Sequence, residues 1–149
     1  MTQIRRLGPA DTATVMAAAH LFDGPPLADA TERFLAADDH HILLAVHGEA
    51  GQQRAVGMVT GVETTHPDKG TEMFLYELGV DEAARGRGVG RALVEALAEL
   101  ASARGCYGMW VAVDADNGPA LATYRSAGAV PDDGAQHVLT WDLRPATGE

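Results

Sequence analysis

The chain has 149 residues, near the usual size of one domain, and its 11 basic and 21 acidic side chains give a formal net charge of −10. Its hydrophobic share of 46% and charged share of 21% are ordinary globular values, which exclude a collagen-like, coiled-coil or disordered chain. The acidic balance excludes nucleic acid and anionic membrane surfaces as favoured partners and would steer a cationic substrate inward, although it also fits simple solubility.

The first half of the chain predicts a strand, two helices and a strand pair. The strand is expected at residues 3–7 and the helices at residues 12–22 and 29–37, from their apolar spacing and the turn signals around them. The apolar runs at residues 42–46 and 55–62 predict two antiparallel strands joined by a short loop.

The second half predicts strands that alternate with helices. A strand at residues 73–80 precedes the clearest helical signal, in which apolar residues recur at i, i+3, i+4 and i+7 over residues 89–101. Strands at residues 107–113 and 137–143 are expected on either side of a helix at residues 119–127.

This order of elements predicts an α/β fold with a mixed sheet of the α+β kind. The three consecutive middle strands need hairpin connections, which excludes an all-parallel doubly wound sheet. We expect a single domain over residues 1–144 and a frayed tail at residues 145–149.

The sequence gives no sign of a disulfide, a metal site or a membrane segment. Cys106 is the only cysteine and is expected to pack as a small core residue, and the adjacent His40 and His41 would face apart on a strand. No apolar run approaches the roughly 20 residues that span a bilayer, and no signal-like segment follows Met1. We therefore expect a cytoplasmic protein without a metal.

The most informative segment joins the predicted strand at residues 73–80 to the helix that follows. Glycines bring main-chain N–H groups close to a ligand, and the first N–H groups of a helix lack partners within it, so residues 85–91 predict an anion site. The alternative is a glycine-rich helix entry with solvated arginines. Gly90 is followed by Arg91-Ala92, which excludes a Walker loop, and the G-x-G-x-G spacing excludes a dinucleotide fingerprint.

Two motifs in this half resemble those of the GCN5-related N-acetyltransferases. Arg85-x-x-Gly88-x-Gly90 matches the pyrophosphate loop of that family, and Asn117-x-x-Ala120-x-x-x-Tyr124 followed by Gly128 matches its second signature. The usual Gly-Phe is here Gly128-Ala129, and the resemblance covers residues 73–129. It implies an acyl-CoA N-acyltransferase fold whose mostly antiparallel sheet splays between the fourth and fifth strands.

The resemblance also implies where acetyl-CoA would bind. The main chain of Leu78 and Val80 would contact the pantetheine arm, with Gly79 at a bulge, and the amides of residues 85–91 would hold the pyrophosphate. The full set it assigns to the coenzyme is Leu78, Gly79, Val80, Arg85, Gly86, Arg87, Gly88, Val89, Gly90, Arg91, Asn117, Ala120 and Tyr124.

Glu77 and Tyr124 are the candidate catalytic residues. Tyr124 would protonate or hydrogen-bond the departing thiolate, because a phenol has a pKa of about 10 and a thiol one of about 8.5; the alternative is a core tyrosine. Glu77 would act as a base or hold the cation, or is simply a solvated acid. Proton transfer from an ammonium of pKa about 8 to a carboxylate of pKa about 4.3 faces about 4 units, so a base would need a raised pKa or a water relay.

The acceptor is suggested by a second resemblance. Residues 74–80, with Ala115-Asp116 and Pro119-Ala120, are similar to the aminoglycoside 3-N-acetyltransferases, which implies transfer to the 3-amino group of an aminoglycoside. By analogy the acceptor pocket would be lined by acids, which are Glu77, Asp114, Asp116 and Asp142, with Asp29 and Glu32 from the first half. Each of these acids could equally be solvated.

Other functions remain open from the sequence. The acceptor could be another small polyamine or a protein N-terminus, and a noncatalytic acetyl-CoA sensor is the alternative from another class. Relatives of the family are often dimers, so a homodimer is a further expectation.

Overall fold

The computed structural model describes residues 2–132, 134 and 136–146 and contains one five-stranded mixed sheet. The strands lie in chain order, antiparallel except for a parallel pairing of the last two. They are β1 (Thr2–Arg6), β2 (His40–His47), β3 (Arg54–His66), β4 (Gly70–Val80) and β5 (Met109–Trp110). The expected mixed sheet is confirmed.

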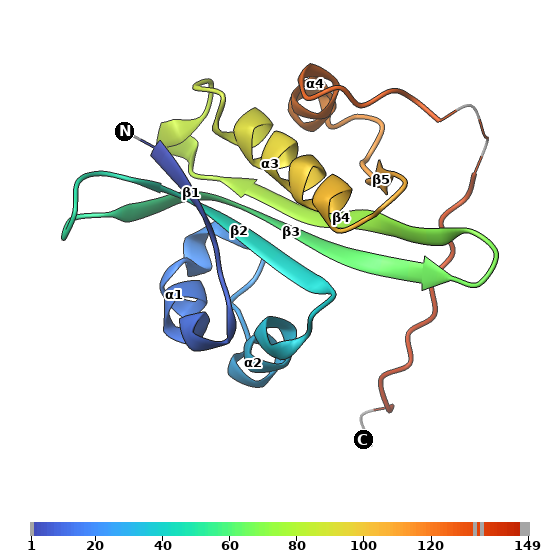
Figure 1. Ribbon diagram of the computed structural model, residues 1–149, viewed down its shortest axis with the longest axis horizontal. Helices are drawn as coiled ribbons and strands as arrows, with labels where there is room; N and C mark the ends of the chain where they lie inside the picture. The colour runs from blue at the N-terminus through green and yellow to red at the C-terminus, as the bar shows by residue number, and fades with distance from the viewer. Residues whose placement is uncertain (1, 133, 135, 147–149) are drawn as a thin grey trace.

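Two pairs of helices cover opposite faces of this sheet (Figure 1). α1 (Thr12–Ala17) and α2 (Ala28–Ala36) lie on one face, and α3 (Val89–Ala103) and α4 (Gly118–Ser126) lie on the other. The helix predicted at residues 12–22 is α1 followed by a separate 3-10 turn. No helix among the described residues is both long and apolar enough to cross a membrane.

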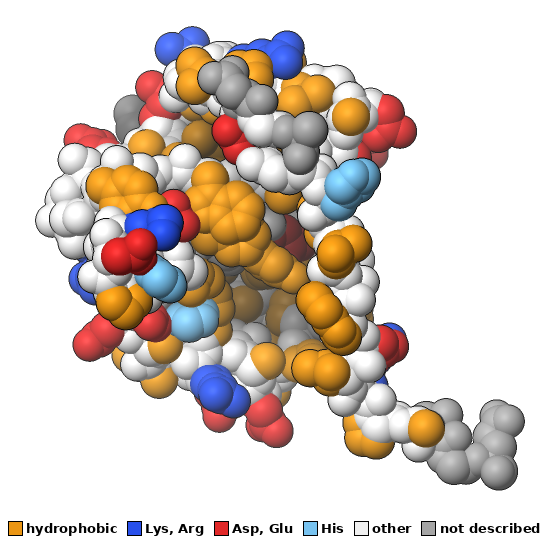
Figure 2. Space-filling model, turned by 90° about the vertical axis from the view of Figure 1, so that its right-hand side faces the viewer, with side chains coloured by type: hydrophobic (Ala, Val, Ile, Leu, Met, Phe, Trp, Pro, Cys, Tyr) orange, Lys and Arg blue, Asp and Glu red, His pale blue; other side chains and the backbone are white. Residues whose placement is uncertain are grey.

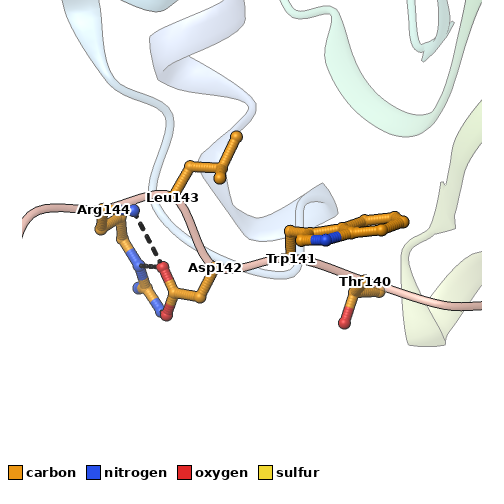
Figure 3. Close-up of a pocket in the computed structure, with 5 residues that line it drawn as sticks. All are labelled: Thr140, Trp141, Asp142, Leu143 and Arg144. Carbon is orange, nitrogen blue, oxygen red and sulfur yellow. Dashed lines mark hydrogen bonds and ion pairs between the residues drawn. The ribbon is translucent and has the colours of Figure 1, made fainter.

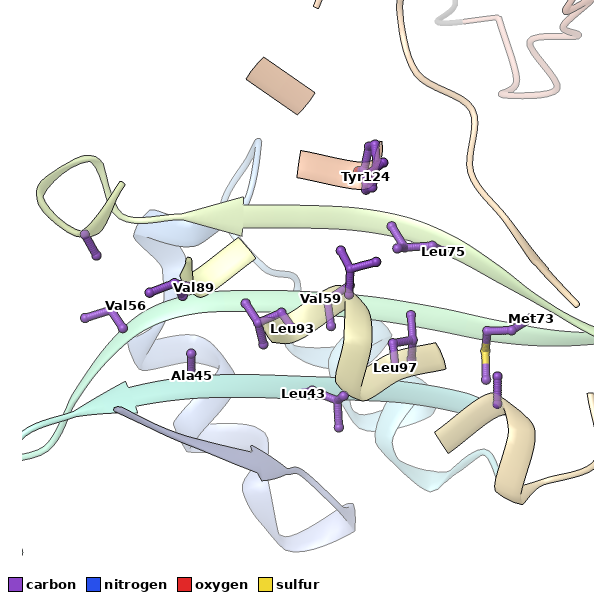
Figure 4. Close-up of a cluster of buried hydrophobic side chains, with 13 residues drawn as sticks. Leu43, Ala45, Val56, Val59, Met73, Leu75, Val89, Leu93, Leu97 and Tyr124 are labelled. Atoms are coloured by element: carbon purple, nitrogen blue, oxygen red, sulfur yellow. The ribbon is translucent and has the colours of Figure 1, made fainter. Parts of the chain in front are cut away.

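Each face of the sheet has its own hydrophobic core. The larger core lies beneath α3 and α4, where Met73, Leu93 and Leu97 are fully buried (Figure 4). The smaller core lies beneath α1 and α2 and contains Leu44 and Met58. The regularly spaced apolar residues of α3 therefore pack against the sheet, as the sequence predicts.

A β-bulge interrupts β4 in the middle of its pairing with β3. Thr60 pairs with Glu77 and Gly61 pairs with Leu75, so Tyr76 is the extra residue. The bulge expected at Gly79 is thus wrong by three positions, since Gly79 pairs regularly with Met58.

Gly79 is instead required by a close approach of another segment. A Cβ at this position would lie 2.0 Å from the carbonyl oxygen of Leu21. Only glycine lets the turn after α1 reach the strand so closely.

The fourth and fifth strands separate almost at once. β4 and β5 pair only through Met73 with Met109 and Phe74 with Trp110, so the strand predicted at residues 107–113 shrinks to two residues. The β4 main chain beyond Leu75 has no strand beside it on this side, within the part of the chain that the structure describes.

The strand predicted at residues 137–143 is wrong. These residues are exposed, belong to no strand and run past the β3–β4 hairpin away from β5 (Figure 1). A strand needs a neighbour for its main-chain hydrogen bonds, and the described residues of this chain place none beside it. Of the tail expected to be frayed, residues 147–149 lie outside the described residues.

Candidate active site

The bulge at Tyr76 determines which main-chain groups of β4 face the open side. Before it, Met73 N–H donates to the Gly108 carbonyl on the β5 side, at 2.9 Å. After it, Asp81 N–H donates to the Val56 carbonyl on β3, at 2.8 Å, so by alternation Leu78 and Val80 turn their main-chain groups away from β3. The two residues expected to contact a pantetheine arm therefore face the splay.

The loop after β4 leads directly into the first turn of α3. Gly86 and Gly88 have φ angles of +77° and +79°, which side-chain-bearing residues rarely adopt. The first intrahelical bond is that of Ala92 N–H to the Gly88 carbonyl, at 3.0 Å, and no side chain of a described residue caps the helix. The N–H groups of residues 89–91 precede that bond and carry the positive end of the helix dipole, as an anion site requires.

The third glycine of the motif brings two helices together. A Cβ on Gly90 would lie 3.1 Å from Cγ2 of Thr123 on α4 and 3.5 Å from Cγ2 of Val80 on β4. The small residue therefore lets the first turn of α3 approach both neighbours.

The three arginines of the loop have different partners. Arg91 is bonded to Glu95 one turn later, at 2.8 Å, and Arg85 donates through Nε to the Val80 carbonyl, at 3.3 Å. Arg87 has no hydrogen bond or ion pair with any described residue and borders a hollow of about 440 Å³ beside the loop. Its charge is therefore available to an anion at the first turn of α3.

The start of α4 contributes the second motif. Asn117 accepts the Ala120 N–H through its side-chain oxygen, at 3.2 Å, and thereby caps the helix. This bond gives Asn117 a structural role beside the one expected at the coenzyme.

Tyr124 is the buried residue of α4, lies at the border of the larger core and is 8% exposed (Figure 4). Burial raises the pKa of the Tyr124 phenol above its usual value, so it stays protonated at neutral pH. Its hydroxyl makes no hydrogen bond to the part of the chain that the structure describes. The phenol therefore keeps a proton that no described residue accepts.

Glu77 lies on the other face of β4, beside the turn that joins α1 to α2. Its Oε2 accepts the main-chain N–H of Asp23 at 2.9 Å, and its own N–H donates to Oγ1 of Thr60 at 3.1 Å. The first bond holds the carboxylate, and the second holds the main chain of Glu77, at one wall of a cavity of about 230 Å³.

The other walls of this cavity are almost entirely apolar. Besides Glu77 they consist of Val15, Phe22, Pro26, Leu27, Ala30, Thr31, Phe34, Ile42, Thr60 and Tyr76. Glu77 is thus the one charged side chain among the lining residues, which suits a ligand that combines a cation with an apolar body. The lining was missed from the sequence, because its residues come from segments that are distant in the chain.

The other acids expected at the acceptor site are not gathered around Glu77. Asp114 and Asp116 are exposed in the turn before α4, and Asp29 and Glu32 are exposed on α2. Asp142 lies at residues 140–144, which border only a shallow surface hollow (Figure 3). There Nε of Arg144 bonds it at 2.8 Å, and that hydrogen bond holds the pKa of Asp142 below its usual value.

A buried polar cluster lies apart from this site. His41 is 2% exposed and bonds through Nε2 to Glu63 at 2.5 Å, while Arg6 bonds to its Nδ1 and Arg104 bonds to Glu63. Burial, the largest influence, holds the pKa of His41 below its usual value. Cys106 lies half-buried against the larger core, as expected for a small packing residue.

Comparison with known proteins matches the chain to one family. Residues 14–129 match the model of the acetyltransferase (GNAT) family. A mycothiol acetyltransferase of Jonesia denitrificans is 37% identical over 100 residues, which cover 67% of this chain and 30% of that protein. The chain spans less than a third of the length of the curated relatives it matches.

Solved structures of similar fold include aminoglycoside acetyltransferases. HMB0005, from an uncultured soil metagenomic sample, has a TM-score of 0.75 and 28% identity and covers 98% of this chain and 99% of its own. Meta-AAC0020, from such a sample and in complex with sisomicin, has a TM-score of 0.83 and 19% identity, with coverage of 96% and 97%. Aminoglycoside N-acetyltransferase AAC(6′)-Iy in complex with CoA has a TM-score of 0.73 and 20% identity, with coverage of 97% and 95%. The last two likenesses show the shared fold.

Proposed function

The chain belongs to the acetyltransferase (GNAT) family, and on that basis we propose that it transfers the acetyl group of acetyl-CoA to a primary amine. The observation that carries this proposal is the unbonded N–H row at residues 89–91, next to outward-facing main-chain groups on β4. A diphosphate fits the first feature and an extended amide-bearing arm fits the second. CoA is bound in one structure of the same fold.

The donor half of the site would work mainly through the main chain. The amides of residues 89–91 and the guanidinium of Arg87 would hold the diphosphate. Leu78 and Val80 would bond the pantetheine amides as an added strand would, although the Val80 carbonyl already accepts Nε of Arg85.

Tyr124 would stabilise the sulfur that leaves when the amine takes the acetyl group. Its raised pKa keeps the proton on the phenol, and a hydroxyl that has no partner among the described residues can donate to a thiolate without losing another bond. The amine must arrive as the free base, and no covalent intermediate with the protein is needed.

Glu77 would anchor the acceptor. Its carboxylate is held by the Asp23 N–H and faces the apolar cavity, where an ammonium would find its counter-charge. The Asp23 N–H occupies Oε2 of Glu77, and the carboxylate can still bind the ammonium of the acceptor. To act as a base, Glu77 would need a water molecule that relays the proton from the amine.

The first acceptor candidate is the 3-amino group of an aminoglycoside. The likeness of residues 74–80 to the 3-N-acetyltransferases supports it, and so does the 28% identity to an aminoglycoside acetyltransferase. AAC(6′)-Iy is named for another position, so the regiochemistry rests on the sequence resemblance alone. An aminoglycoside is also the only one of the candidates for which we propose that further acids contact the acceptor. These acids are Asp114, Asp116 and Asp142.

A second acceptor candidate is an amine with an apolar body. The cavity beside Glu77 favours it, because an aminoglycoside inserted there would leave its hydroxyl groups without partners. The similarity to mycothiol acetyltransferases suggests a third acceptor to test, which is the amine whose acetylation gives mycothiol.

A thiol-release assay with purified protein and acetyl-CoA tests these candidates. The acceptors are gentamicin, spermidine, phenethylamine and the mycothiol precursor amine, each scanned over concentration. Turnover with gentamicin at the 3-amino group, located by mass spectrometry of the product, supports the first candidate. Turnover with phenethylamine alone supports the second, and calorimetry that detects no CoA binding would remove the proposed function altogether.

A further inference from the structure

One face of β4 extends the cavity beside Glu77 as a row of acidic and aromatic side chains. Met73 belongs to the larger core, so by alternation Glu72 and Phe74 lie on the opposite face of the sheet. Tyr76 and Glu77 follow on the same face, because the bulge lets both of them line the cavity. The side chains that we call the β4 row are Glu72, Phe74, Tyr76 and Glu77.

The aromatic part of the β4 row is uncovered. The ring of Phe74 stacks on that of Trp110 in β5, with 4.3 Å between the centroids, and meets Tyr76 edge-on at 5.6 Å. Trp110 and Tyr76 remain 47% and 69% exposed. Figure 2, which views the molecule from the end of the β3–β4 hairpin, shows apolar side chains around a hollow between the body and residues 136–144. Exposed aromatic faces of this kind attract cations.

A carboxylate stands at each end of the β4 row, and each has one oxygen left open. Oε2 of Glu72 accepts the hydroxyl of Tyr107 at 3.0 Å, and Oε2 of Glu77 accepts the main-chain N–H of Asp23 at 2.9 Å. The other oxygen of each carboxylate has no bond to any described residue. Both side chains are therefore held in place by other segments and can each still accept a bond from a cation.

The register of the sheet sets the distance between these two carboxylates. Glu72 pairs with Thr64 and Glu77 pairs with Thr60, four residues apart on β3. At about 3.3 Å per residue, the two main-chain positions are separated by about 13 Å. An extended saturated chain advances about 1.2 Å per bond, so about ten bonds connect two charges at this separation.

We propose that Glu72 and Trp110 form a distal subsite, which binds a second cation of the acceptor about ten bonds from the amine that is acetylated. This inference rests on the proposed function and adds to it a requirement for charge at both ends of the acceptor. Glu77 holds the reacting end, while Tyr76 and Phe74 contact the chain between the two charges. Trp110 pairs with Phe74, two positions from Glu72 along β4, so its ring lies within reach of the same ligand group.

The open carboxylate oxygens favour a cation over an uncharged occupant. An uncharged chain that covered the β4 row would remove water from both carboxylates and give them no hydrogen-bond donor in return, which costs free energy. An ammonium at Glu72 supplies that donor, and its charge also lies against the ring of Trp110. The net charge of −10 further draws an acceptor with two cations toward the protein.

Fluorescence titration of the full chain without coenzyme tests the distal subsite. Trp110 and Trp141 are the two tryptophans of the sequence, so a Trp141→Phe background leaves Trp110 as the only tryptophan reporter. We expect 1,10-diaminodecane to change its emission and to bind about 10-fold more tightly than 10-aminodecan-1-ol, which has the same length and a single charge. In the short pair, 1,4-diaminobutane and 4-aminobutan-1-ol, neither compound spans the β4 row, so their affinities should differ little. A preference no larger in the long pair than in the short pair would overturn the proposal.

Two matched substitutions locate this preference in the molecule. Glu72→Gln keeps the size of the side chain and removes its charge, so the two long compounds should then bind about equally. Glu99→Gln makes the same change at an exposed position of α3, on the other face of the sheet, and should keep the preference. A preference that survives Glu72→Gln, or that Glu99→Gln removes to the same extent, would contradict the assignment of the subsite.

Turnover separates the distal subsite from the proposed function. Contacts to the distal cation are the same before and during acetyl transfer, so the preference for 1,10-diaminodecane should appear in KM and not in kcat. Acetylation of both long compounds with equal KM values would overturn the distal subsite and leave acetyl transfer standing. A chain that binds no CoA in calorimetry would instead remove the proposed function, while the fluorescence titration would still decide whether the β4 row binds a dication.

Discussion

Two substitutions at Gly88, to asparagine and to aspartate, test the proposed diphosphate site because they differ in charge and not in shape. Asparagine and aspartate have the same shape, and both tolerate a positive φ better than other side chains do. Gly88 has a φ of +79°, and a Cβ there would meet no other heavy atom within 4 Å. Gly88→Asn and Gly88→Asp should therefore each cost about 1 kcal/mol of folding free energy, from backbone strain alone.

The two variants should differ in coenzyme affinity. At a separation of about 5 Å, a unit charge repels a phosphate charge by about 0.8 kcal/mol in water and about 3 kcal/mol at a protein surface. Because about 1.36 kcal/mol corresponds to a tenfold change, Gly88→Asp should bind CoA about 4- to 160-fold more weakly than Gly88→Asn.

Isothermal titration calorimetry with CoA measures this difference directly. Repeating the titration in 1 M salt, where the screening length falls to about 3 Å, should remove most of the gap between the variants. Equal affinity of Gly88→Asp and Gly88→Asn at low salt would refute the anion site at α3. Thermal unfolding of both variants provides the control for folding.

Three further predictions concern the remaining polar groups. Tyr124→Phe should lower kcat about 100-fold and leave the Kd for CoA, measured by calorimetry, nearly unchanged; full turnover would exclude the phenol from the reaction. Glu77→Gln should lower kcat/KM for cationic acceptors about 10- to 100-fold at constant CoA affinity, and an unchanged value would move the acceptor elsewhere. The free energy of unfolding should fall as pH drops below about 6.5, by up to about 1.4 kcal/mol per pH unit, because burial lowers the pKa of His41 and the unfolded chain takes up its proton first. Denaturant titrations at pH 7.5 and 5.5 should show a smaller fall for His41→Gln, and an equal fall in both proteins would contradict this assignment.

The sequence predicts well the features that depend on local chemistry. The glycine-rich entry to α3, the helix that begins with a proline in its first turn and the apolar spacing of α3 all follow from neighbouring residues. The order of strands also follows, because hairpins and helical crossovers restrict the topology.

Features that depend on contacts between distant segments could not be predicted. The bulge at Tyr76 depends on the register with β3, and the need for Gly79 arises from Leu21, far away in the chain. The cavity beside Glu77 combines residues of two helices with residues of three strands, so no motif marks it.

The error at residues 137–143 has a different origin. The alternation of apolar residues there is real, but it specifies only that a strand is suited to pairing. Pairing also needs a neighbouring strand, and the described residues of this chain place none beside the segment. The same reasoning explains why Asp142 does not meet Glu77 within the described chain.

The contact between Gly79 and Leu21 is the tightest approach of the turn after α1 to β4. It holds the turn after α1 against the strand whose outward main chain faces the splay. Segments beyond that anchor, at residues 22–30, can change in length and composition to accommodate different amines while the thioester-facing half keeps its geometry. The close contact at Gly79 thus keeps β4 in place while the acceptor side of the molecule varies.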